Sequence, residues 1–277
     1  MNERYDNTEP VASLRARRIS AAGESDASHV EEDVGVVVEA PITIDVEGIE
    51  NYTLLCTPTD TKALALGFLF TEGIVENTSQ IVHLEHCEDA ADVIRVRLTD
   101  AVPKIGDPSR NLLIVSSCGA CGTEDLDTRI QALPKVFDNL RVSSTVLHSA
   151  REGLAGMQTL FEKCGGTHAA GIYDEAGTIL TSAEDAGRHN ALDKAIGKCL
   201  LANTPTVGKA AALSGRVSLE MVSKCARAGI ELISAISAPT TLAIEVADQC
   251  GITLCAFVRE TRATVFTHPH RLTDAGR

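Results

Sequence analysis

The second half of the chain alternates short apolar segments with helical ones, and this alternation constrains the fold more than any other feature. Segments rich in Val, Ile, Leu and Ala predict strands, and longer segments with a helical period predict helices. In chain order the predicted elements are strands at 167–174 and 178–184, a helix at 189–201, a strand at 209–215, a helix at 218–229, a strand at 231–237, a helix at 239–251, and strands at 252–258 and 263–268. Strands separated by helices in this order predict an α/β fold with a largely parallel or mixed sheet.

Turn and cap residues mark the ends of several predicted helices. Pro239 is expected to open the helix that Gly251 closes. In the first half, residues 59–75 predict a helix with Asp60 as its N-cap and Gly73 near its end. One further helix is expected over 149–163.

The first half also predicts strands, preceded by a polar segment. Residues 36–56 read as two strands joined at Glu47 and Gly48, and 81–86 with 92–99 read as a hairpin. Residues 1–33 are polar and charged and predict a flexible tail. We therefore divide the chain into a tail (1–33), an N-terminal α/β part (34–142) that carries a Cys-x-x-Cys loop (114–124), and a C-terminal domain (143–277).

Charge and cysteine content exclude several classes of function. The net charge of −13 argues against binding to nucleic acid or to an anionic membrane surface, so an anionic ligand needs a local basic pocket. No apolar run approaches the roughly 18 residues of a membrane span, and the N-terminus lacks an apolar leader segment. Nine cysteines, an odd number in a chain of 277 residues, predict free thiols in a reducing compartment, and we expect a cytoplasmic protein.

The predicted strand ends of the C-terminal half carry most of its uncommon polar residues. Ligands of α/β sheets bind beyond the carboxyl ends of the strands. Those ends carry the segments "GGTHAAG", "EDAGRHN", "SGRVS", "SAPT" and "FVRETR". We expect these segments to converge on one edge of the sheet.

The segment "SSCGACG" places Cys118 and Cys121 just before a predicted helix. A helix N-terminus lowers the pKa of a nearby thiol, and Gly119 and Gly122 let the backbone bend. The spacing alone permits four interpretations: a structural zinc site, a thioredoxin-like redox pair, a zinc-dependent deaminase, and a nucleophile that carries sulfur as a persulfide. A structural zinc site normally needs a second pair of ligands, which is absent, so we assign no metal ligands.

The deaminase interpretation depends on His83-Leu84-Glu85, which precedes the cysteine pair. Ser117 stands where that signature has proline, and the histidine segment reads as a strand. A persulfide carrier needs an ionisable thiol, a mobile mount and a neighbour that can resolve the intermediate. The motif is compatible with all three requirements.

Seven segments together resemble the FdhD family of formate dehydrogenase accessory proteins. The similarity runs from about residue 33 to residue 272 and rests on "ALGFLFTEGIV", "SSCGACG", "GGTHAAGIYD", "EDAGRHNALDKAIG", "LSGRVSLEMVSKCARAGI", "SAPTTLAIEVADQCGITL" and "FVRETRATVFTHPHRL". It implies a sulfur carrier that takes sulfur from a cysteine desulfurase as a cysteine persulfide. The sulfur then passes to the molybdenum or tungsten of a bis(molybdopterin guanine dinucleotide) substrate, for formate dehydrogenase.

The resemblance also implies roles for individual residues, a fold and an assembly. Cys118 would carry the persulfide and Cys121 would assist. The C-terminal half would be a cytidine-deaminase-like three-layer sandwich beside a smaller N-terminal α/β part, and the protein would be a homodimer. The dinucleotide carries two diphosphates and needs cations, and a guanine nucleotide such as GDP could occupy the same site. The candidate cofactor-binding residues are His168, Asp185, Arg188, His189, Arg216, Phe257, Val258, Arg259, Glu260, Thr261 and Arg262. The alternative is a non-catalytic chaperone that binds the molybdenum cofactor and whose cysteines only gate access.

Overall fold

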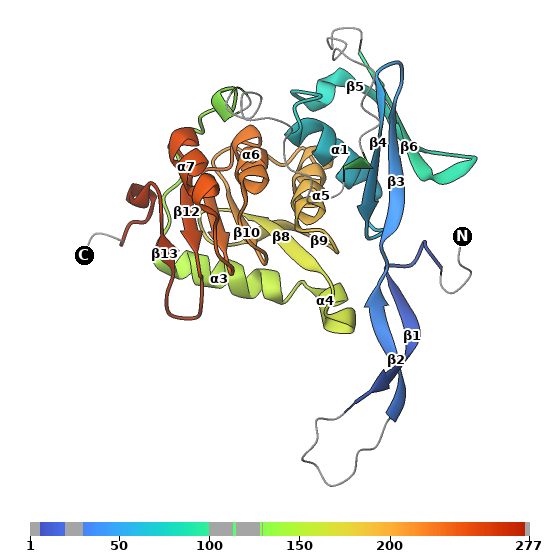
Figure 1. Ribbon diagram of the computed structural model, residues 1–277. Helices are drawn as coiled ribbons and strands as arrows, with labels where there is room; N and C mark the ends of the chain where they lie inside the picture. Colours follow the sequence, from blue (N-terminus) through green and yellow to red (C-terminus); the bar gives the residue numbers. More distant parts are fainter. Residues whose placement is uncertain (1–5, 20–29, 100–112, 115–127, 129, 275–277) are drawn as a thin grey trace.

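The computed structural model describes residues 6–19, 30–99, 113–114, 128 and 130–274. These residues form a six-stranded sheet with helices on both faces, a five-stranded sheet beside it, and a two-stranded hairpin that extends away from both (Figure 1). The mixed α/β class predicted from the sequence is confirmed.

The C-terminal sheet has the strand order β13-β12-β11-β10-β8-β9. Strands β10, β11 and β12 are parallel, whereas β8, β9 and β13 run antiparallel to their neighbours. The sheet is therefore mixed, as the alternation of strands and helices predicts. Its strands are β8 (His168–Tyr173), β9 (Ile179–Asp185), β10 (Ala210–Leu213), β11 (Leu232–Ala235), β12 (Thr253–Ala256) and β13 (Thr264–Val265).

Helices cover both faces of this sheet and give it three layers. Helices α5, α6 and α7 lie on one face and α3 on the other (Figure 1). Strand β10 shows why, because Ala211 and Leu213 pack into the core on the first face while Ala210 and Ala212 pack into the core on the second. The helices are α3 (Ser144–Ala155), α4 (Thr159–Cys164), α5 (Arg188–Leu201), α6 (Leu219–Arg227) and α7 (Thr241–Cys250).

The N-terminal sheet has the strand order β5-β6-β3-β4-β7 and packs against helix α1. Buried Leu64 and Phe68 of α1 share a core with Ile44 and Leu54 of the sheet. The turn between β3 and β4 contains Gly48 with a φ of 73°, as the predicted turn requires. The elements are β3 (Ala40–Val46), β4 (Glu50–Cys56), α1 (Thr61–Thr71), the 3-10 turn η1 (Thr78–Gln80), β5 (Ile81–Cys87), β6 (Ala90–Leu98) and β7 (Leu113–Ile114).

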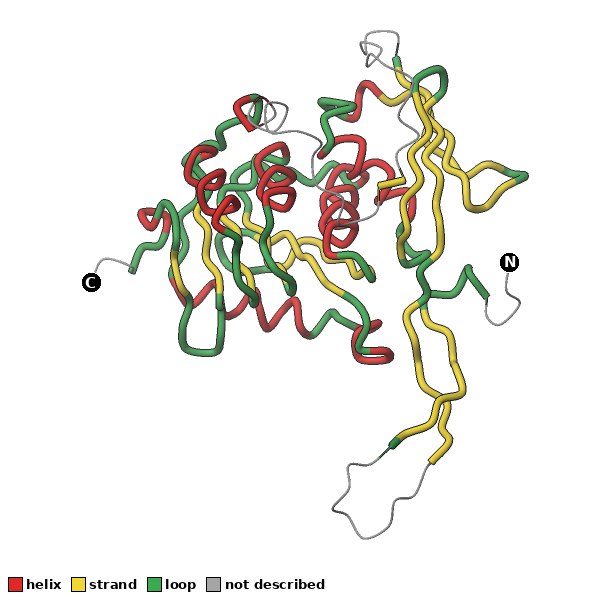
Figure 2. Tube along the Cα trace, in the orientation of Figure 1, coloured by secondary structure: helices red, strands yellow, loops and turns green. Residues whose placement is uncertain are grey.

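The prediction of a flexible tail over 1–33 is wrong for the residues described there. Strands β1 (Val11–Arg18) and β2 (Val30–Val37) form an antiparallel hairpin (Figure 2). Exposed ion pairs cross between the strands, among them Arg15–Asp33 at 3.6 Å and Arg18–Glu32 at 2.9 Å. Such cross-strand pairs stabilise a hairpin rich in charge, a composition that the sequence analysis took for disorder.

Helix ends differ from the predictions at three places. Asp60 precedes α1 in the left-handed region, with a φ of 52°, and its carboxylate pairs with Lys198 at 2.7 Å instead of capping the helix. The helix predicted at 149–163 is two helices, since α3 ends at the C-cap Gly156 before α4 begins. Thr240 caps α7, so Pro239 lies before the helix, whereas Gly251 closes it in the left-handed conformation as predicted.

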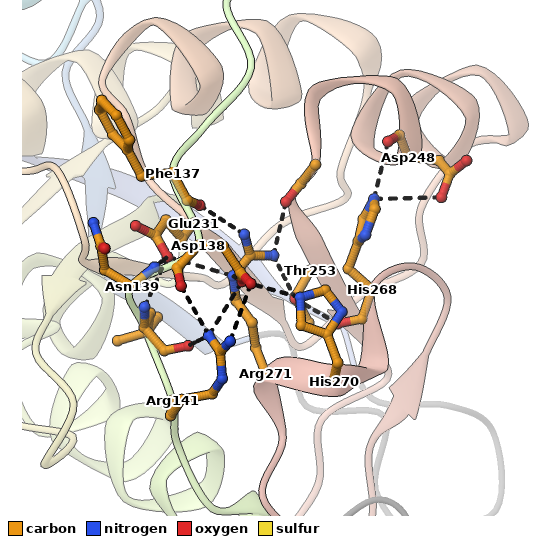
Figure 3. A network of polar contacts seen from close by, with 12 residues as sticks. Phe137, Asp138, Asn139, Arg141, Glu231, Asp248, Thr253, His268, His270 and Arg271 are labelled. Atoms are coloured by element: carbon orange, nitrogen blue, oxygen red, sulfur yellow. Dashed lines mark hydrogen bonds and ion pairs between the residues drawn. The ribbon is translucent and has the colours of Figure 1, made fainter.

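A buried arginine near the C-terminus ties residues 137–142 to the C-terminal sheet (Figure 3). Arg271, in the 3-10 turn η2 (Pro269–Arg271), donates to the carbonyl oxygens of Gly251 and Phe137, both at 2.7 Å. Its Nε lies 3.4 Å from buried Glu231, which accepts the Asn139 backbone N–H at 2.8 Å.

In the described part of the chain, no helix is both long and apolar enough to span a bilayer.

Candidate functional site

The predicted site segments gather where the parallel strands of the six-stranded sheet have their carboxyl ends. We call this part of the sheet its edge. His168 starts β8 and pairs in register with Asp185, which ends β9. Leu213, the last residue of β10, pairs with Ala170 only two residues from His168. The loops that follow β9 and β10 therefore leave the sheet beside His168 and lead into α5 and α6.

Two arginines and a histidine form a cationic cluster at this edge. A Cβ added to Gly215 would lie 3.2 Å from Nδ1 of His168 and 3.4 Å from Cβ of Arg188, so both side chains flank this glycine. Burial, followed by the charge of Arg216, lowers the pKa of Arg188. The Arg188 Nε is buried and has no hydrogen-bond partner among the described residues. Within the described part of the chain, no carboxylate lies within ion-pair distance of Arg188 or Arg216, although the more distant charge of Glu220 partly offsets that of Arg188.

Burial and the two arginines both favour the neutral form of His168. Burial lowers the pKa of His168, and the charges of Arg188 and Arg216 lower it further. Two guanidinium groups without a paired acid repel each other, and an anion between them would relieve that repulsion. In a chain with a net charge of −13, this cluster supplies the local positive charge that an anionic ligand requires.

His189 follows Arg188 in the first turn of α5 and points toward the start of α6. Its Nε2 lies 3.4 Å from Oγ of Ser218 and 3.9 Å from the Glu220 carboxylate. Burial lowers the pKa of His189 to about 4, with further lowering by Arg188 and Lys224. The imidazole is therefore neutral near pH 7, and it can donate one hydrogen bond and accept another without adding a positive charge.

Asp185 is fully buried, and both of its oxygens are occupied. Oδ1 accepts the Gly187 N–H at 2.8 Å and the Asn190 side-chain amide at 3.1 Å. Oδ2 accepts the Thr57 N–H at 3.0 Å and forms an ion pair with Lys194 at 2.6 Å. Of the two roles expected for Asp185, contact with a ligand or orientation of its neighbours, this geometry favours the second.

The segment 257–262 forms the loop between β12 and β13. Phe257 has a φ of 52°, a left-handed conformation that is unusual for a bulky residue, and its side chain is half-exposed. Val258 is buried, and its N–H donates to the Ala235 carbonyl at 3.0 Å. Arg259 donates to the Ile236 carbonyl at 2.6 Å, and its N–H closes the turn onto the Arg262 carbonyl at 2.8 Å.

The loop residues and the cationic cluster occupy different parts of the same edge. Strands β10 and β12 are separated by β11 alone, which places the loops that follow them roughly 10 Å apart. Glu260, Thr261 and Arg262 are exposed, and no contact among the described residues joins them to Arg188 or Arg216. A ligand that touched both groups would have to be extended along the edge.

Cys118 and Cys121 lie outside the described residues. The structure places the strand that precedes them, because β7 ends at Ile114 and pairs in parallel with β4. The register sets Ile114 beside Leu54, three residues before Thr57. Thr57 in turn contacts Asp185 and so the turn that carries Arg188.

Comparisons with known proteins agree with the resemblance seen in the sequence. The model of the FdhD/NarQ family matches residues 37–273. This chain belongs to the FdhD/NarQ family. A relative from Bordetella bronchiseptica, named sulfur carrier protein FdhD, is 38% identical over 265 residues, which cover 95% of this chain and 93% of the relative. A protein of the same name from Saccharolobus solfataricus is 36% identical, with 94% of this chain and 99% of the relative covered.

A solved structure shows that the fold is shared over nearly the whole chain. The crystal structure of a proposed formate dehydrogenase accessory protein from Desulfotalea psychrophila matches this FdhD/NarQ member with a TM-score of 0.74. The two chains are 25% identical, and the match covers 95% of this chain and 99% of the other.

Sequence reasoning missed the buried polar residues that support the site of this FdhD/NarQ member. Asn190 and Lys194 hold Asp185, and Lys194 also donates to the Thr57 carbonyl at 2.8 Å. Asn190 and Lys194 are four residues apart on α5, so their spacing places both on one helix face. Nothing in the sequence around Thr57 indicates that it contacts Asp185, which lies 128 residues further along the chain.

A cavity of about 360 Å³ lies elsewhere, between α4, β9 and the Asp60–Lys198 ion pair. It shares none of the predicted site residues. Its charged groups are already engaged, since Asp60 and Lys198 pair with each other and Glu184 accepts from Leu160, Phe161 and Thr167. The cationic cluster is therefore the better candidate for an anionic ligand.

Proposed function

We propose that this chain is a sulfur carrier that serves formate dehydrogenase and delivers its sulfur to a nucleotide-bearing substrate held at the cationic edge. The observation that carries the proposal is the cluster of Arg188, Arg216 and His168, two cations and a neutral imidazole with no paired acid in the described part of an acidic chain. Membership of the FdhD/NarQ family and relatives named sulfur carrier protein support it.

In the first step, Cys118 receives sulfur from a cysteine desulfurase. The Cys118 thiolate attacks the outer sulfur of the donor persulfide, a new S–S bond forms, and the donor cysteine leaves as a thiolate. No net oxidation occurs in this exchange. Cys121, three residues away, would assist the transfer.

The acceptor in the proposal is the metal of a bis(molybdopterin guanine dinucleotide), with molybdenum or tungsten. The diphosphate groups would lie against Arg188 and Arg216, which form charge-assisted hydrogen bonds with phosphate oxygens. The half-exposed Phe257 ring and the loop with Arg259 and Arg262 would contact the guanine end. The acting species would be a homodimer, with the desulfurase and formate dehydrogenase as partners.

The strand register is compatible with a short path between the cysteines and the edge. Cys118 is four residues beyond Ile114, and an extended chain of that length spans at most about 14 Å. Leu54, the partner of Ile114, lies about 10 Å along β4 from Thr57, which contacts the turn before Arg188. Delivery from Cys118 to a ligand at Arg188 is therefore compatible with the strand register.

Mass spectrometry after incubation with a cysteine desulfurase and cysteine tests the carrier step. We expect an adduct of about 32 Da, one sulfur atom, on Cys118. Cys118→Ser should abolish it, whereas Cys87→Ser, which replaces a thiol outside the motif, should keep it. Absence of the adduct from both cysteines of the motif would favour the chaperone that only binds the cofactor.

Calorimetric titration with GDP tests the acceptor site. We expect Arg259→Ala with Arg262→Ala to weaken GDP binding while persulfide loading of Cys118 persists. Loss of both activities together would indicate a folding defect and would contradict the assignment of these residues to binding.

A further inference from the structure

A buried carboxylate with four polar contacts, that of Asp185, lies behind the cationic cluster. Asp185 and Lys194 are both fully buried and form an ion pair at 2.6 Å. The pair carries no net charge, so the charged group that this turn presents at the edge is Arg188. Removing two ions from water is costly, and loss of either partner would leave the other as an unpaired buried charge.

We propose that Asp185 and Thr57 are positioning residues that fix Arg188 relative to strand β4, and through β4 relative to the strand that leads into Cys118. This inference rests on the proposed function, because it concerns the alignment of the sulfur-carrying segment with the anion-binding edge. It gives Asp185 a role behind the ligand and not in contact with it.

Thr57 uses all three of its backbone and hydroxyl groups in this junction. Its N–H donates to Asp185 at 3.0 Å, its hydroxyl accepts the Ala186 N–H at 3.1 Å, and its carbonyl accepts the Lys194 ammonium at 2.8 Å. Two residues earlier, the Leu55 carbonyl accepts the Asn190 amide at 2.8 Å. The end of β4 is therefore held to the turn between β9 and α5 at several points.

The junction also organises the start of α5. Gly187 is the N-cap of α5 and has no side chain to cap it, and its own N–H is bound by Asp185 at 2.8 Å. Arg188 is the next residue. A shift of Ala186 would therefore move the Arg188 backbone directly, since only Gly187 lies between them.

On the other side of the junction, β4 carries the neighbour of the cysteine segment. Leu54 pairs with Ile114, the last residue of β7. The Leu54–Thr57 segment thus connects two points: the strand before Cys118 and the turn before Arg188. This short segment therefore ties the position of β7 to that of the turn that carries Arg188.

The experiment compares two isosteric substitutions at fully buried threonines. Thr57→Val removes the hydroxyl that holds Ala186, and Thr71→Val removes a hydroxyl that donates to Asp193 at 2.7 Å in a second contact between the N-terminal part and α5. Both variants lose buried hydrogen bonds, and Thr71→Val should lose at least as much stability as Thr57→Val, because the Thr71 hydroxyl also accepts the Lys224 ammonium at 3.0 Å. We expect Thr57→Val to weaken GDP binding at least about fivefold and Thr71→Val to leave it within about twofold. Thr57→Ser, which keeps the hydroxyl, should restore affinity.

A second measurement on the ligand-free protein separates this inference from the proposed function. Hydrogen exchange of the Gly187 and Ala191 amides should accelerate in Thr57→Val and not in Thr71→Val. Equal affinities and equal exchange in the two variants would overturn the positioning role. If the unmodified protein fails to bind GDP, the acceptor site of the proposed function is wrong, and the exchange comparison alone then decides the positioning role.

Discussion

Gly67 of α1 and Gly197 of α5 face each other where the two halves of the molecule meet. A Cβ added to Gly197 would lie 3.0 Å from the Gly67 amide nitrogen and only 1.8 Å from the Ala63 carbonyl oxygen. A Cβ on Gly67 would lie 1.9 Å from the Asp193 carbonyl oxygen. The two helix backbones are therefore in direct contact. Because α5 begins with Arg188, this contact also fixes the position of the cationic cluster relative to α1.

Substitution of either glycine by alanine should therefore destabilise the protein strongly. The obstructing atoms are backbone, which cannot rotate away, so we expect Gly67→Ala and Gly197→Ala each to cost about 3 kcal/mol or more. Urea denaturation followed by circular dichroism measures this. Gly156→Ala is the control, because its Cβ would meet nothing closer than 3.7 Å, and it should be neutral or slightly stabilising. Similar values for all three variants would contradict the close contact.

A second prediction concerns Lys224, which joins α1, α5 and α6. Its ammonium lies 2.8 Å from Asp193 and 2.8 Å from Glu72, both carboxylates, and 3.0 Å from Thr71. Lys224→Met would leave the buried Asp193 without its cation, and we expect a loss of about 3–5 kcal/mol. Exposed Lys62→Met, which removes a pair at the surface, should cost less than about 1 kcal/mol. Thermal and urea unfolding of both variants would show whether the difference exists.

The pattern of strands and helices in the second half was predictable because each element obeys its own period. Strands β8, β10, β11 and β12 are buried on both faces, and α5 to α7 end or begin at residues that the sequence marks, such as Gly251. The convergence of the site segments on one edge was predictable from the topology, since the loops that follow parallel strands all leave the sheet at the same end. His168, Asp185, Arg188 and Arg216 were thus predicted to lie at one edge, and they do.

Contacts between distant segments could not be predicted in this way. The contact of Thr57 with Asp185 depends on how the two sheets dock, which no local period encodes. The β1–β2 hairpin was missed for a different reason. A segment rich in charged residues predicts disorder, and its charges stabilise a strand pair only where opposite charges such as Arg15 and Asp33 face each other across the strands. Periodicity reports the buried face of an element and not its partner.

The pH dependence of stability should reveal His189. Its pKa is lowered to about 4 in the folded protein, against an ordinary value near 6.5. The unfolded chain therefore binds the proton more readily between these values, and stability falls as the pH drops from about 6.5 to about 4, by roughly 3 kcal/mol if His189 acted alone. Above about pH 6.5, His189 is neutral in both the folded and the unfolded chain, so this loss of stability is absent.

Unfolding free energies measured across this range test the assignment. His189→Gln should flatten the slope because glutamine does not titrate there. Some slope should persist, since the pKa of His168 is lowered as well. His83→Gln, which removes a half-buried histidine of β5 outside this site, is the control for the loss of one imidazole. An unaltered slope in His189→Gln would mean that the histidine is not held neutral by its surroundings.

The last prediction separates ligand binding from stability at Arg216. This exposed side chain lies beside Arg188, and within the described residues no acid is paired with either group, so the two charges oppose each other when no anion is bound. Arg216→Ala should leave the free energy of unfolding unchanged or raise it slightly, and should let the pKa of His168 rise toward its ordinary value in an NMR titration. The same variant should weaken GDP binding about tenfold or more, because a charge-assisted bond to phosphate is lost. Arg141→Ala, which removes an exposed arginine paired with Asp138 at 3.0 Å, should leave the affinity unchanged. If Arg216→Ala bound GDP as tightly as the unmodified protein, the phosphates would have to lie elsewhere along the edge, and the repulsion between the two arginines would have no ligand to relieve it.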